Sequence, residues 1–397
     1  MPLKIKVKPE DFMVEEIARL PLVKNGEYGA YLLTKKGWNT VELLLELSGR
    51  LNVPFRNFAY GGRKDRYGLT SQYVSIKGRR YPDINERAYS LKFAGFMRRP
   101  MGPDLIRENK FDVTVRRLSK DYAQESAARI KDISSFGYPN YFDDQRFGSF
   151  DIRQGFLAEK ILKKEFNGAL KIYMTYVYAK GKKEERDRRA FFFAHWKDWK
   201  ACRTQAKTRF EEEAFDFLLE KPAGFLELLK SIPRHELSPF FSAYQSYLWN
   251  EILRRLITSE IPGPFSSYKG LAGDYIFYTG MNQKAYSYLR DLNIPVPGYG
   301  FIAGDEPVKR IYIQVMEDNN LKNSSFNRVK LRQVFFKSFS RQAIVKPRDL
   351  NFELPDDEIY TGNKKLRLKF FLPRGSYATM LIKSIFSQFA VEKSGIP

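Results

Sequence analysis

The sequence predicts an α/β (α+β) domain that is built from both ends of the chain and interrupted by a mostly helical insertion. Strand-like alternation dominates the first part of the chain, long helical patterns dominate the middle, and strand and helix return near the C-terminus. A length of 397 residues is enough for two or three structural units. We therefore expect one domain from residues 1–151 and 336–397, and a second from residues 152–335.

The N-terminal part repeatedly alternates apolar and polar residues, as half-buried strands do. Between two such stretches, leucines recur at helical spacing after Asn39 and Thr40, either of which can cap a helix over residues 39–51. A second helix is expected over residues 121–137, where Gly137 ends it. Strands are expected at residues 3–8, 12–17, 27–36, 72–78, 88–97 and 111–118.

The middle of the chain carries long helical patterns, and the C-terminal part returns to a strand at residues 365–373 and a helix at 375–390. Ser376 is the expected N-cap of that last helix. The middle helices are expected at residues 153–166, 207–221 and 238–257, before a polar stretch with Gly and Pro at 260–308. The apolar face of the last helix consists of Ala378, Leu381, Ile382, Ile385 and Phe389.

The charge of the chain indicates a polyanionic partner. Lys and Arg total 68 against 46 Asp and Glu, which gives a formal net charge of +22 and a pI near 9.7. Dispersed basic pairs in a globular protein are typical of nucleic-acid binding, although solvated surface lysine, as in many thermophilic proteins, is the alternative. The pairs are Arg79-Arg80, Arg98-Arg99, Arg116-Arg117, Lys163-Lys164 and Arg188-Arg189.

Several classes of protein are disfavoured. Cys202 is the only cysteine, so a disulfide within the chain is impossible and a reducing compartment is favoured. No apolar run reaches the length of a membrane span, and the N-terminus lacks a signal-peptide pattern, so we expect a soluble cytoplasmic protein. The sequence contains neither a P-loop nor a zinc-protease motif, and His195 and His235 are its only histidines. Chemistry would therefore rest on carboxylates, lysines, tyrosines or the bound substrate.

The segment "GGRKDRYGLTSQ", residues 61–72, places one carboxylate among cations. Asp65 lies between Lys64 and Arg66, and the two leading glycines permit unusual backbone angles or close backbone approach. Neighbouring cations favour the ionised carboxylate, as an active site with a polyanionic substrate requires. A solvated turn is the alternative interpretation.

The segment "PNYFDDQRFGSF", residues 139–150, combines side chains that suit an unpaired base. Its rings can stack on a base, its amides can read a base edge and its arginine can hold a phosphate. A core loop with buried rings is the alternative. Together, the two segments describe an enzyme that acts on an extruded nucleotide. The side chains concerned are Asn140, Tyr141, Phe142, Gln145 and Arg146.

These stretches resemble the TruD family of RNA pseudouridine synthases. The resemblance extends over nearly the whole chain and includes an insertion of the family's kind. Four stretches match the family pattern in order, and "GWNT", "NKFDVTVR" and "LSPFFSAYQSYLWN" also resemble it. The four are "KVKPEDFMVEEI", "GGRKDRYGLTSQ", "PNYFDDQRFG" and "FFLPRGSYATMLIK".

The resemblance implies a pseudouridine-synthase catalytic fold with a mixed, largely antiparallel sheet, and isomerisation of uridine in tRNA, typically at position 13 of the D-arm. It implies that Asp65 is the catalytic residue and that Phe142 stacks on the target uracil. One departure is the pair Asp143-Asp144, where family members often carry Gly. The other implied substrate-binding residues are Lys6, Phe12, Lys64, Asn140, Gln145, Arg146 and Phe370.

The implied reaction breaks the bond from ribose C1′ to uracil N1 and joins C5 to C1′, with no net change in atoms. It therefore requires no cofactor and no metal. Asp65 can act as a nucleophile at C1′, or as a base that removes a ribose proton to give a glycal-like intermediate. We expect folded tRNA to bind in a basic cleft, with no membrane and no obligate protein partner.

Two other hypotheses belong to different classes of function. The chain can be an RNA-binding protein that keeps the fold without catalysis, although its Asp65 argues against this. A metal-dependent nuclease would need clustered carboxylates, for which Glu15-Glu16 and Asp143-Asp144 are the candidates near the two segments. The basic run at residues 182–189 can contact RNA, but a solvated helix face is the favoured interpretation.

Overall fold

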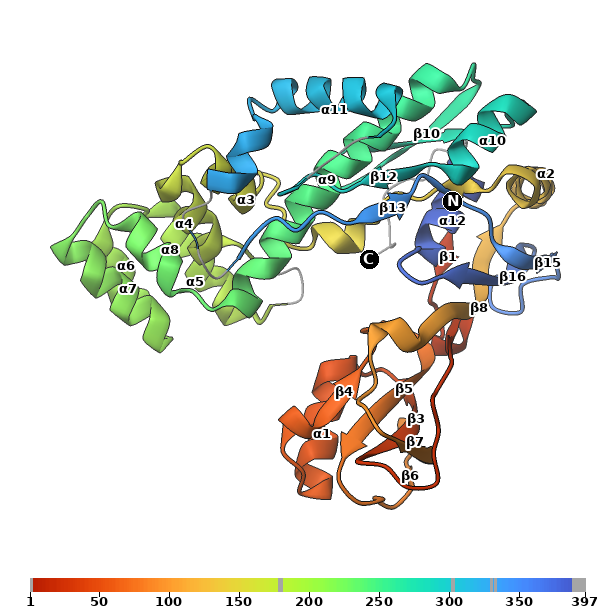
Figure 1. The fold of residues 1–397 in the computed structure, drawn as a ribbon, viewed down its shortest axis with the longest axis horizontal. Helices are drawn as coiled ribbons and strands as arrows, with labels where there is room; N and C mark the ends of the chain where they lie inside the picture. Colours follow the sequence, from red (N-terminus) through yellow and green to blue (C-terminus); the bar gives the residue numbers. More distant parts are fainter. Residues whose placement is uncertain (1–2, 178–180, 301–303, 329–330, 332–333, 388–397) are drawn as a thin grey trace. The chain divides into compact units, whose positions relative to one another are not determined.

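The computed structural model describes residues 3–177, 181–300, 304–328, 331 and 334–387 (Figure 1). The chain divides into two compact units, which are described separately below. The first unit contains Met1–Tyr138 and Val345–Pro397, and the second contains Pro139–Ile344.

The first unit is built on a mixed sheet. Among the described residues, ten strands join in the order β15-β16-β8-β2-β5-β3-β7-β6, with β1 paired to β8 and β4 paired to β5. The β2–β5 pair is parallel and the other pairs of this sheet are antiparallel, which confirms the predicted fold class. The strands are β1 (Lys4–Ile5), β2 (Phe12–Ala18), β3 (Tyr28–Lys36), β4 (Phe58–Tyr60), β5 (Leu69–Lys77), β6 (Ile84–Asn85), β7 (Tyr89–Met97), β8 (Ile106–Leu118), β15 (Arg348–Glu353) and β16 (Lys364–Pro373).

Strand register brings one row of buried side chains across the sheet. Directly paired residues share a face, so each pairing extends the row to the next strand. Every member of the row is at most 9% exposed. The row consists of Phe370, Phe111, Val14, Thr70, Lys35 and Tyr89.

Helices pack on this buried face. Helix α1 (Thr40–Leu51) places Leu43, Leu44 and Leu47 in a cluster with apolar residues of β3 and β5. Asn39 is its N-cap, because the Asn39 side chain accepts a hydrogen bond from the Glu42 N–H. Helices α2 (Lys120–Phe136) and α12 (Ala378–Phe386) contact each other, and α2 contacts β8 and β16.

Two local predictions in the first unit are wrong. The first strand ends at Ile5, because Lys6 adopts a φ of 57° that a strand does not accommodate. The last helix begins at Ala378 with Tyr377 in the N-cap position, so Ser376 precedes the cap. Phe389, expected on the apolar face of this helix, lies outside the described residues. The predicted end of α2 at Gly137 is confirmed, with a φ of 70°.

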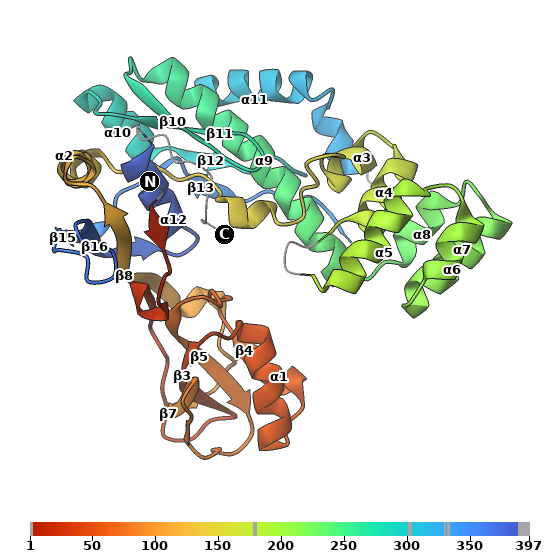
Figure 2. The same ribbon diagram turned by 180° about the vertical axis from the view of Figure 1, so that it is seen from behind.

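The second unit is mostly helical, as Figure 2 shows from behind. Its longest helix, α9 (Arg234–Glu260), includes the predicted helix 238–257 and buries Tyr244, Leu248 and Trp249 completely. The predicted helix 153–166 is too long, because only residues 157–162 of it form a helix. Lys164 then takes a left-handed φ of 61°, and the next helix begins at Phe166. The other helices are α3 (Leu157–Leu162), α4 (Phe166–Thr175), α5 (Lys183–Ala194), α6 (Trp199–Gln205), α7 (Arg209–Glu220), α8 (Phe225–Ser231), α10 (Gln283–Asp291) and α11 (Glu306–Asp318).

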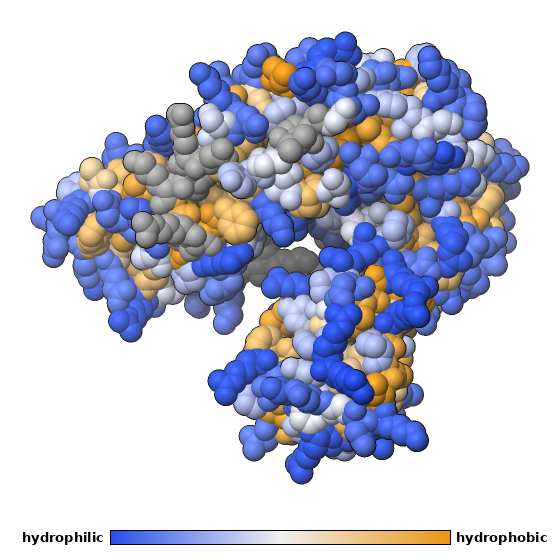
Figure 3. All heavy atoms as spheres, in the orientation of Figure 1, coloured by the Kyte–Doolittle hydropathy of each residue, from blue (hydrophilic) through white to orange (hydrophobic). Residues whose placement is uncertain are grey.

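Short strands and turns complete this unit. A hairpin joins β10 (Phe265–Lys269) and β11 (Asp274–Tyr278), in the region predicted only as a polar stretch. A second pair joins β12 (Asn293–Pro295) and β13 (Ser340–Gln342). Hydrophilic residues cover much of the visible face of both units (Figure 3).

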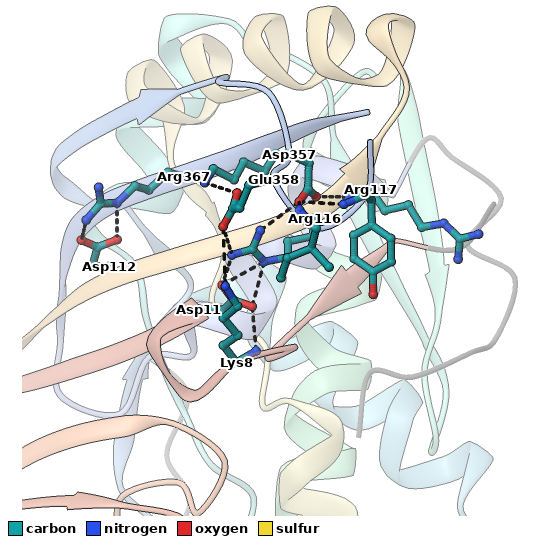
Figure 4. Close-up of polar contacts among 11 residues, drawn as sticks. Lys8, Asp11, Asp112, Arg116, Arg117, Asp357, Glu358 and Arg367 are labelled. Carbon is teal, nitrogen blue, oxygen red and sulfur yellow. Dashed lines mark hydrogen bonds and ion pairs between the residues drawn. The ribbon is translucent and has the colours of Figure 1, made fainter. Parts of the chain in front are cut away.

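A buried ion cluster ties the N-terminal segment of the first unit to β8 and to the β15–β16 connection (Figure 4). Arg116 of β8 donates to both oxygens of Asp11 at 3.0 Å and to Asp357 Oδ1 at 2.9 Å. The Arg116 and Asp357 side chains are 4% and 0% exposed. Glu358, half exposed, accepts a further hydrogen bond at 3.0 Å. Asp11 ends the short 3-10 helix η1 (Pro9–Asp11), which follows the bend at Lys6.

Arg116→Met should destabilise the protein by about 3–5 kcal/mol, because it leaves two buried carboxylates without their cation. Urea denaturation will measure this loss. Arg367→Met is the matched control, since Arg367 is 40% exposed where it pairs with Asp112, and should cost about 1 kcal/mol or less. An equal loss in both variants would contradict a special role for the buried cluster.

Acid should weaken the same cluster. Burial opposes ionisation of Asp357. Hydrogen bonds from the backbone N–H groups of Ile359, Arg117 and Tyr360, together with one from the Arg116 side chain, outweigh this effect and lower the pKa of the carboxyl. The stability that Asp357 contributes is therefore present above about pH 4 and is lost as the pH falls through its lowered pKa. In Arg116→Met, denaturation midpoints should fall less steeply below about pH 4 than in the parent protein.

Candidate active site

Asp65 lies in an irregular loop, residues 61–68, that connects β4 to β5 on the buried face of the sheet. Three neighbouring strands, β2, β5 and β3, present inward rows that are apolar along most of their length. Each row also contains a polar residue near the loop, Glu16 in β2, Gln72 in β5 and Lys35 in β3, and all three are at most 2% exposed. The β5 row contains a second buried polar residue, Thr70. Glu16, Gln72 and Lys35 hold the loop.

The Lys35 side chain binds backbone carbonyl groups of the loop and of the preceding turn. Its Nζ donates to the carbonyl oxygens of Trp38 at 2.7 Å, Lys64 at 3.2 Å and Asp65 at 2.7 Å. An ammonium group has three N–H donors, so three carbonyls match its full capacity. Burial lowers the pKa of Lys35 to about 8, against the opposing attraction of Asp65.

Gln72 and Thr40 hold the other side of the loop. The Gln72 amide donates to Gly62 O at 2.9 Å and accepts from the Thr40 hydroxyl at 2.8 Å. The same hydroxyl accepts from the Lys64 N–H at 3.0 Å. The first residue of α1 therefore fixes the backbone immediately before Asp65. Gly61 is required by close approach, since a Cβ there would lie 2.4 Å from Ile106.

Lys64 turns its ammonium toward the interior. Its Nζ lies 2.9 Å from Oε2 of the buried Glu16 and donates to Asn109 Oδ1 at 2.6 Å. The Lys64 side chain is only 11% exposed. This ion pair connects the loop to β2 and β8. A contact between Lys64 and substrate stays a prediction.

Asp65 itself is paired on one side and accessible on the other. Its Oδ2 accepts from Lys6 Nζ at 2.9 Å, while the Asp65 side chain remains 33% exposed and the Lys6 side chain 6%. The same Nζ lies 4.3 Å from the centre of the Phe12 ring, within cation–π range. The structure therefore brings Lys6, Phe12 and Asp65 together, and their roles in a reaction stay predictions.

Phe370 is linked to this group through a ring ladder. Phe12 meets Phe111 edge-on at 6.3 Å, and Phe111 stacks on Phe370 at 5.2 Å. Phe370 is 1% exposed, whereas Phe371 faces the opposite side of the sheet beneath Arg348. Phe370 therefore supports Phe12 from two strands away. Its contact with substrate stays a prediction.

The second motif lies in the other unit, where Arg341 organises it. Arg341 donates to the backbone oxygen and side-chain oxygen of Asn140, each at 2.8 Å. Its guanidinium also lies 4.2 Å from the centre of the Phe142 ring, which meets Trp249 edge-on at 5.4 Å. Asn250 exchanges two hydrogen bonds of 2.9 Å with the backbone of Phe142.

The rest of this loop explains the acidic departure from the family pattern. Asp144 accepts from the Leu271 N–H and the Tyr275 hydroxyl, both at 2.8 Å, and so holds the β10–β11 hairpin. Arg146 donates to Ser246 Oγ at 3.3 Å, and Gln145 is exposed. The extra carboxylate has a structural role within the unit.

Each motif thus forms a cluster within its own unit, and their joint action in one site stays a prediction. Four residues that hold the loop were not predicted from the sequence motifs: Lys35, Gln72, Glu16 and Thr40. Period-2 alternation contains a signal for the first three, because each falls on the inward side of its strand. Their partners in the loop are not visible in that pattern.

The described residues contain neither a candidate metal-binding group nor a candidate membrane-spanning helix. No group of three or more His, Cys, Asp or Glu side chains in the described part of the chain is placed to hold a metal ion. No helix among residues 3–177, 181–300, 304–328 and 334–387 is long and apolar enough to cross a membrane.

Comparison with known proteins covers nearly the whole chain. A family model of tRNA pseudouridine synthase D (TruD) matches residues 2–385. The Methanococcus maripaludis protein named "Probable tRNA pseudouridine synthase D 1" is 31% identical, with 97% of this chain and 100% of that protein aligned. The tRNA pseudouridine synthase D of Aquifex aeolicus is 29% identical over 97% and 98% of the two chains. A crystal structure of a Methanosarcina mazei protein assigned to TruD is similar with a TM-score of 0.72, at 26% identity and over 96% and 92% of the chains.

Thr40→Val should destabilise the protein by about 1–3 kcal/mol, because it removes the partner of both Gln72 and the Lys64 N–H without changing side-chain shape. Chemical denaturation will measure the loss. Thr34→Val is the control, since the Thr34 hydroxyl contacts only Ser71 among the described hydrogen bonds and both side chains are partly exposed. A loss in Thr40→Val no greater than in the control would show that the loop does not depend on Thr40.

Proposed function

The chain belongs to the tRNA pseudouridine synthase D (TruD) family, and we propose that it isomerises uridine to pseudouridine at position 13 of the tRNA D-arm. The family model and relatives aligned over nearly their whole length support the activity. The observation that carries the chemical assignment is the Lys6–Asp65 pair, in which a carboxylate on a firmly held loop keeps a third of its side chain exposed.

Asp65 is the group that acts on the ribose. One route is attack of its carboxylate on C1′, which displaces uracil through N1, followed by attack of uracil C5 on C1′ and release of the carboxylate. The other is removal of a ribose proton to give a glycal-like intermediate that later regains it. In both routes the proton on C5 is lost and N1 gains one. Lys6 contributes by holding the carboxylate of Asp65 in place through their 2.9 Å ion pair.

Extrusion of the target base from its stack costs about a few kcal/mol, and stacking on a ring returns about 1–3 kcal/mol. We assign this stacking to Phe142. Phe142 is 4% exposed, and the guanidinium groups of Arg341 and Arg146 lie 4.2 Å and 5.7 Å from the centre of its ring. Stacking would therefore require the base to displace one of these side chains. Asn140, which shares Arg341 with Phe142, would orient the base or the loop beside it.

The substrate is tRNA, held mainly through its phosphates. The net charge of +22 favours a polyanion, and the affinity should fall steeply as salt rises. We place Gln145 and Arg146 among the residues that contact it. Lys64 would have to leave its ion pair with the buried Glu16 to bind a phosphate. Asp144 holds the β10–β11 hairpin, and neither Asp143 nor Asp144 is assigned to the chemistry.

Release of tritium from tRNA labelled at uracil C5 tests the activity, because isomerisation frees this tritium and binding alone does not. The purified protein should release tritium even in excess EDTA, and the RNA should remain uncleaved. Replacing uridine 13 by cytidine in the transcript should abolish release. Stable binding without tritium release would establish an RNA-binding protein that lacks catalysis. Continued release from the substituted transcript would contradict position 13.

Asp65→Asn should retain tRNA binding and lose turnover by about 1,000-fold or more, because the amide can neither attack C1′ nor accept a ribose proton. Filter binding and tritium release measure the two properties. Asp104→Asn, at a carboxylate that is 58% exposed beside Arg99, should behave as the parent protein. Near-normal turnover of Asp65→Asn would mean that a different carboxylate acts.

A further inference from the structure

Lys35 has a buried ammonium group at a position where the strand needs only an apolar side chain. It continues the inward row of Tyr31 and Leu33, and all three residues are fully buried. A buried ammonium is costly, whereas an apolar side chain of similar length would fill the same volume without that cost. Its three hydrogen bonds go to the turn at Trp38 and to two successive residues of the loop, Lys64 and Asp65.

Two lysines therefore hold Asp65 from different sides. Lys6 binds its carboxylate at 2.9 Å, and Lys35 binds its backbone carbonyl at 2.7 Å. We propose that Lys35 is a positioning residue, whose ammonium fixes the backbone at Lys64 and Asp65 and so aims the carboxylate at the ribose. The proposal rests on the proposed function, since it concerns the same reaction.

The positioning should depend on pH. The charged groups around the Lys35 ammonium are Asp65 and Lys64, while α1 and β5 contribute the neutral Thr40 and Gln72 to the same loop. Burial lowers the pKa of Lys35 to about 8. Above that pH the neutral amine has two N–H donors for three carbonyls, so the loop is held less firmly.

Lys35→Met should lower kcat for tritium release by about 100-fold at pH 7, because a misplacement of about 1 Å has an effect of that size. KM for tRNA should change by less than about twofold, since phosphate contacts lie elsewhere. The parent protein should lose kcat as the pH rises through about 8, with this decline absent from the variant. Lys36→Met is the control, because Lys36 is exposed in its pair with Glu10 and should leave both constants and the pH profile unchanged.

Equal changes in kcat and KM, or the same alkaline decline in both proteins, would assign Lys35 a structural role only. Near-normal kcat in Lys35→Met would also overturn the proposal. If the variant does not fold by circular dichroism, the parent protein decides: a flat kcat profile from pH 7 to 9 contradicts the positioning role. Failure of the parent protein to release tritium at any pH would instead refute the proposed function.

An independent observation concerns the second unit, where exposed rings alternate with a lysine. Phe335 and Phe339 are 56% and 47% exposed, and Lys337 between them is exposed. Tyr299 is 63% exposed and is bridged to Lys337 through the backbone. We call these four residues the aromatic strip.

The aromatic strip is anchored from beneath. Phe336, between the exposed residues, is fully buried and contacts Phe241 with ring centres 4.7 Å apart. Gln245 donates to the carbonyls of Pro297 at 2.7 Å and Lys337 at 3.1 Å, which ties both segments of the strip to α9. Tyr299 N–H donates to Phe336 O at 2.7 Å. The outward side chains are therefore held on a fixed backbone.

Rings interleaved with cations on a fixed backbone are suited to unpaired nucleotides, because every base has a face that can stack. Lys337 supplies one cation, and Arg234 a second, with its guanidinium 5.8 Å from the centre of the Phe335 ring. We infer that the aromatic strip binds unpaired nucleotides of the RNA substrate. This inference also rests on the proposed function, but it assigns a surface separate in sequence from both motifs.

The double variant Phe335→Ala/Phe339→Ala should raise the Kd for a tRNA transcript by about tenfold or more, with kcat at saturating tRNA unchanged. Lys337→Ala should raise Kd less and reduce its dependence on salt. Ile313→Ala is the control, because this residue is 46% exposed on α11 of the same unit and should leave Kd unchanged. With purified protein and RNA only, an unchanged Kd in the double variant would overturn the inference in favour of a protein partner, while tritium release by the parent protein would still stand.

Discussion

The irregular backbone around Asp65 is the constraint on which the first unit depends. A loop on the buried face of a sheet cannot satisfy its polar groups by strand pairing, so side chains must supply the partners. Lys35, Gln72 and Thr40 do this at the carbonyls of residues 62, 64 and 65 and at the Lys64 N–H. The polar residues within otherwise apolar strand rows follow from this requirement.

Buried charged groups in the first unit are also held by specific partners. Buried charges are tolerated when an opposite charge or several hydrogen bonds surround them, and four charged groups in the interior of the first unit meet this condition. Glu16 has Lys64, Asp11 and Asp357 share Arg116, and Lys35 has three carbonyls. Asp65 differs, because its partner Lys6 leaves the carboxylate partly accessible. A carboxylate that is fixed and still accessible is suited to the role that we propose for Asp65.

In the second unit, one arginine holds the loop of the second motif in place. Arg341 joins the amide of Asn140 and the ring of Phe142, so the two residues assigned to the base cannot move independently of it. Asp144 joins the same loop to the β10–β11 hairpin. The loop of the second motif is thus held by contacts to residues more than 100 positions later in the chain.

The sequence by itself determined the elements that depend on near neighbours. Alternation located β2, β3, β5 and β7, helical spacing and the Asn39 cap located α1, and the two motifs indicated Asp65 and Phe142. Only the tertiary structure decided which polar side chains lie inside, where Lys6 bends the chain, and where the helix predicted at residues 153–166 begins and ends. Lys35 shows the reason. Its burial is stabilised by carbonyls 29 and 30 residues away, and no local pattern records a contact over that distance.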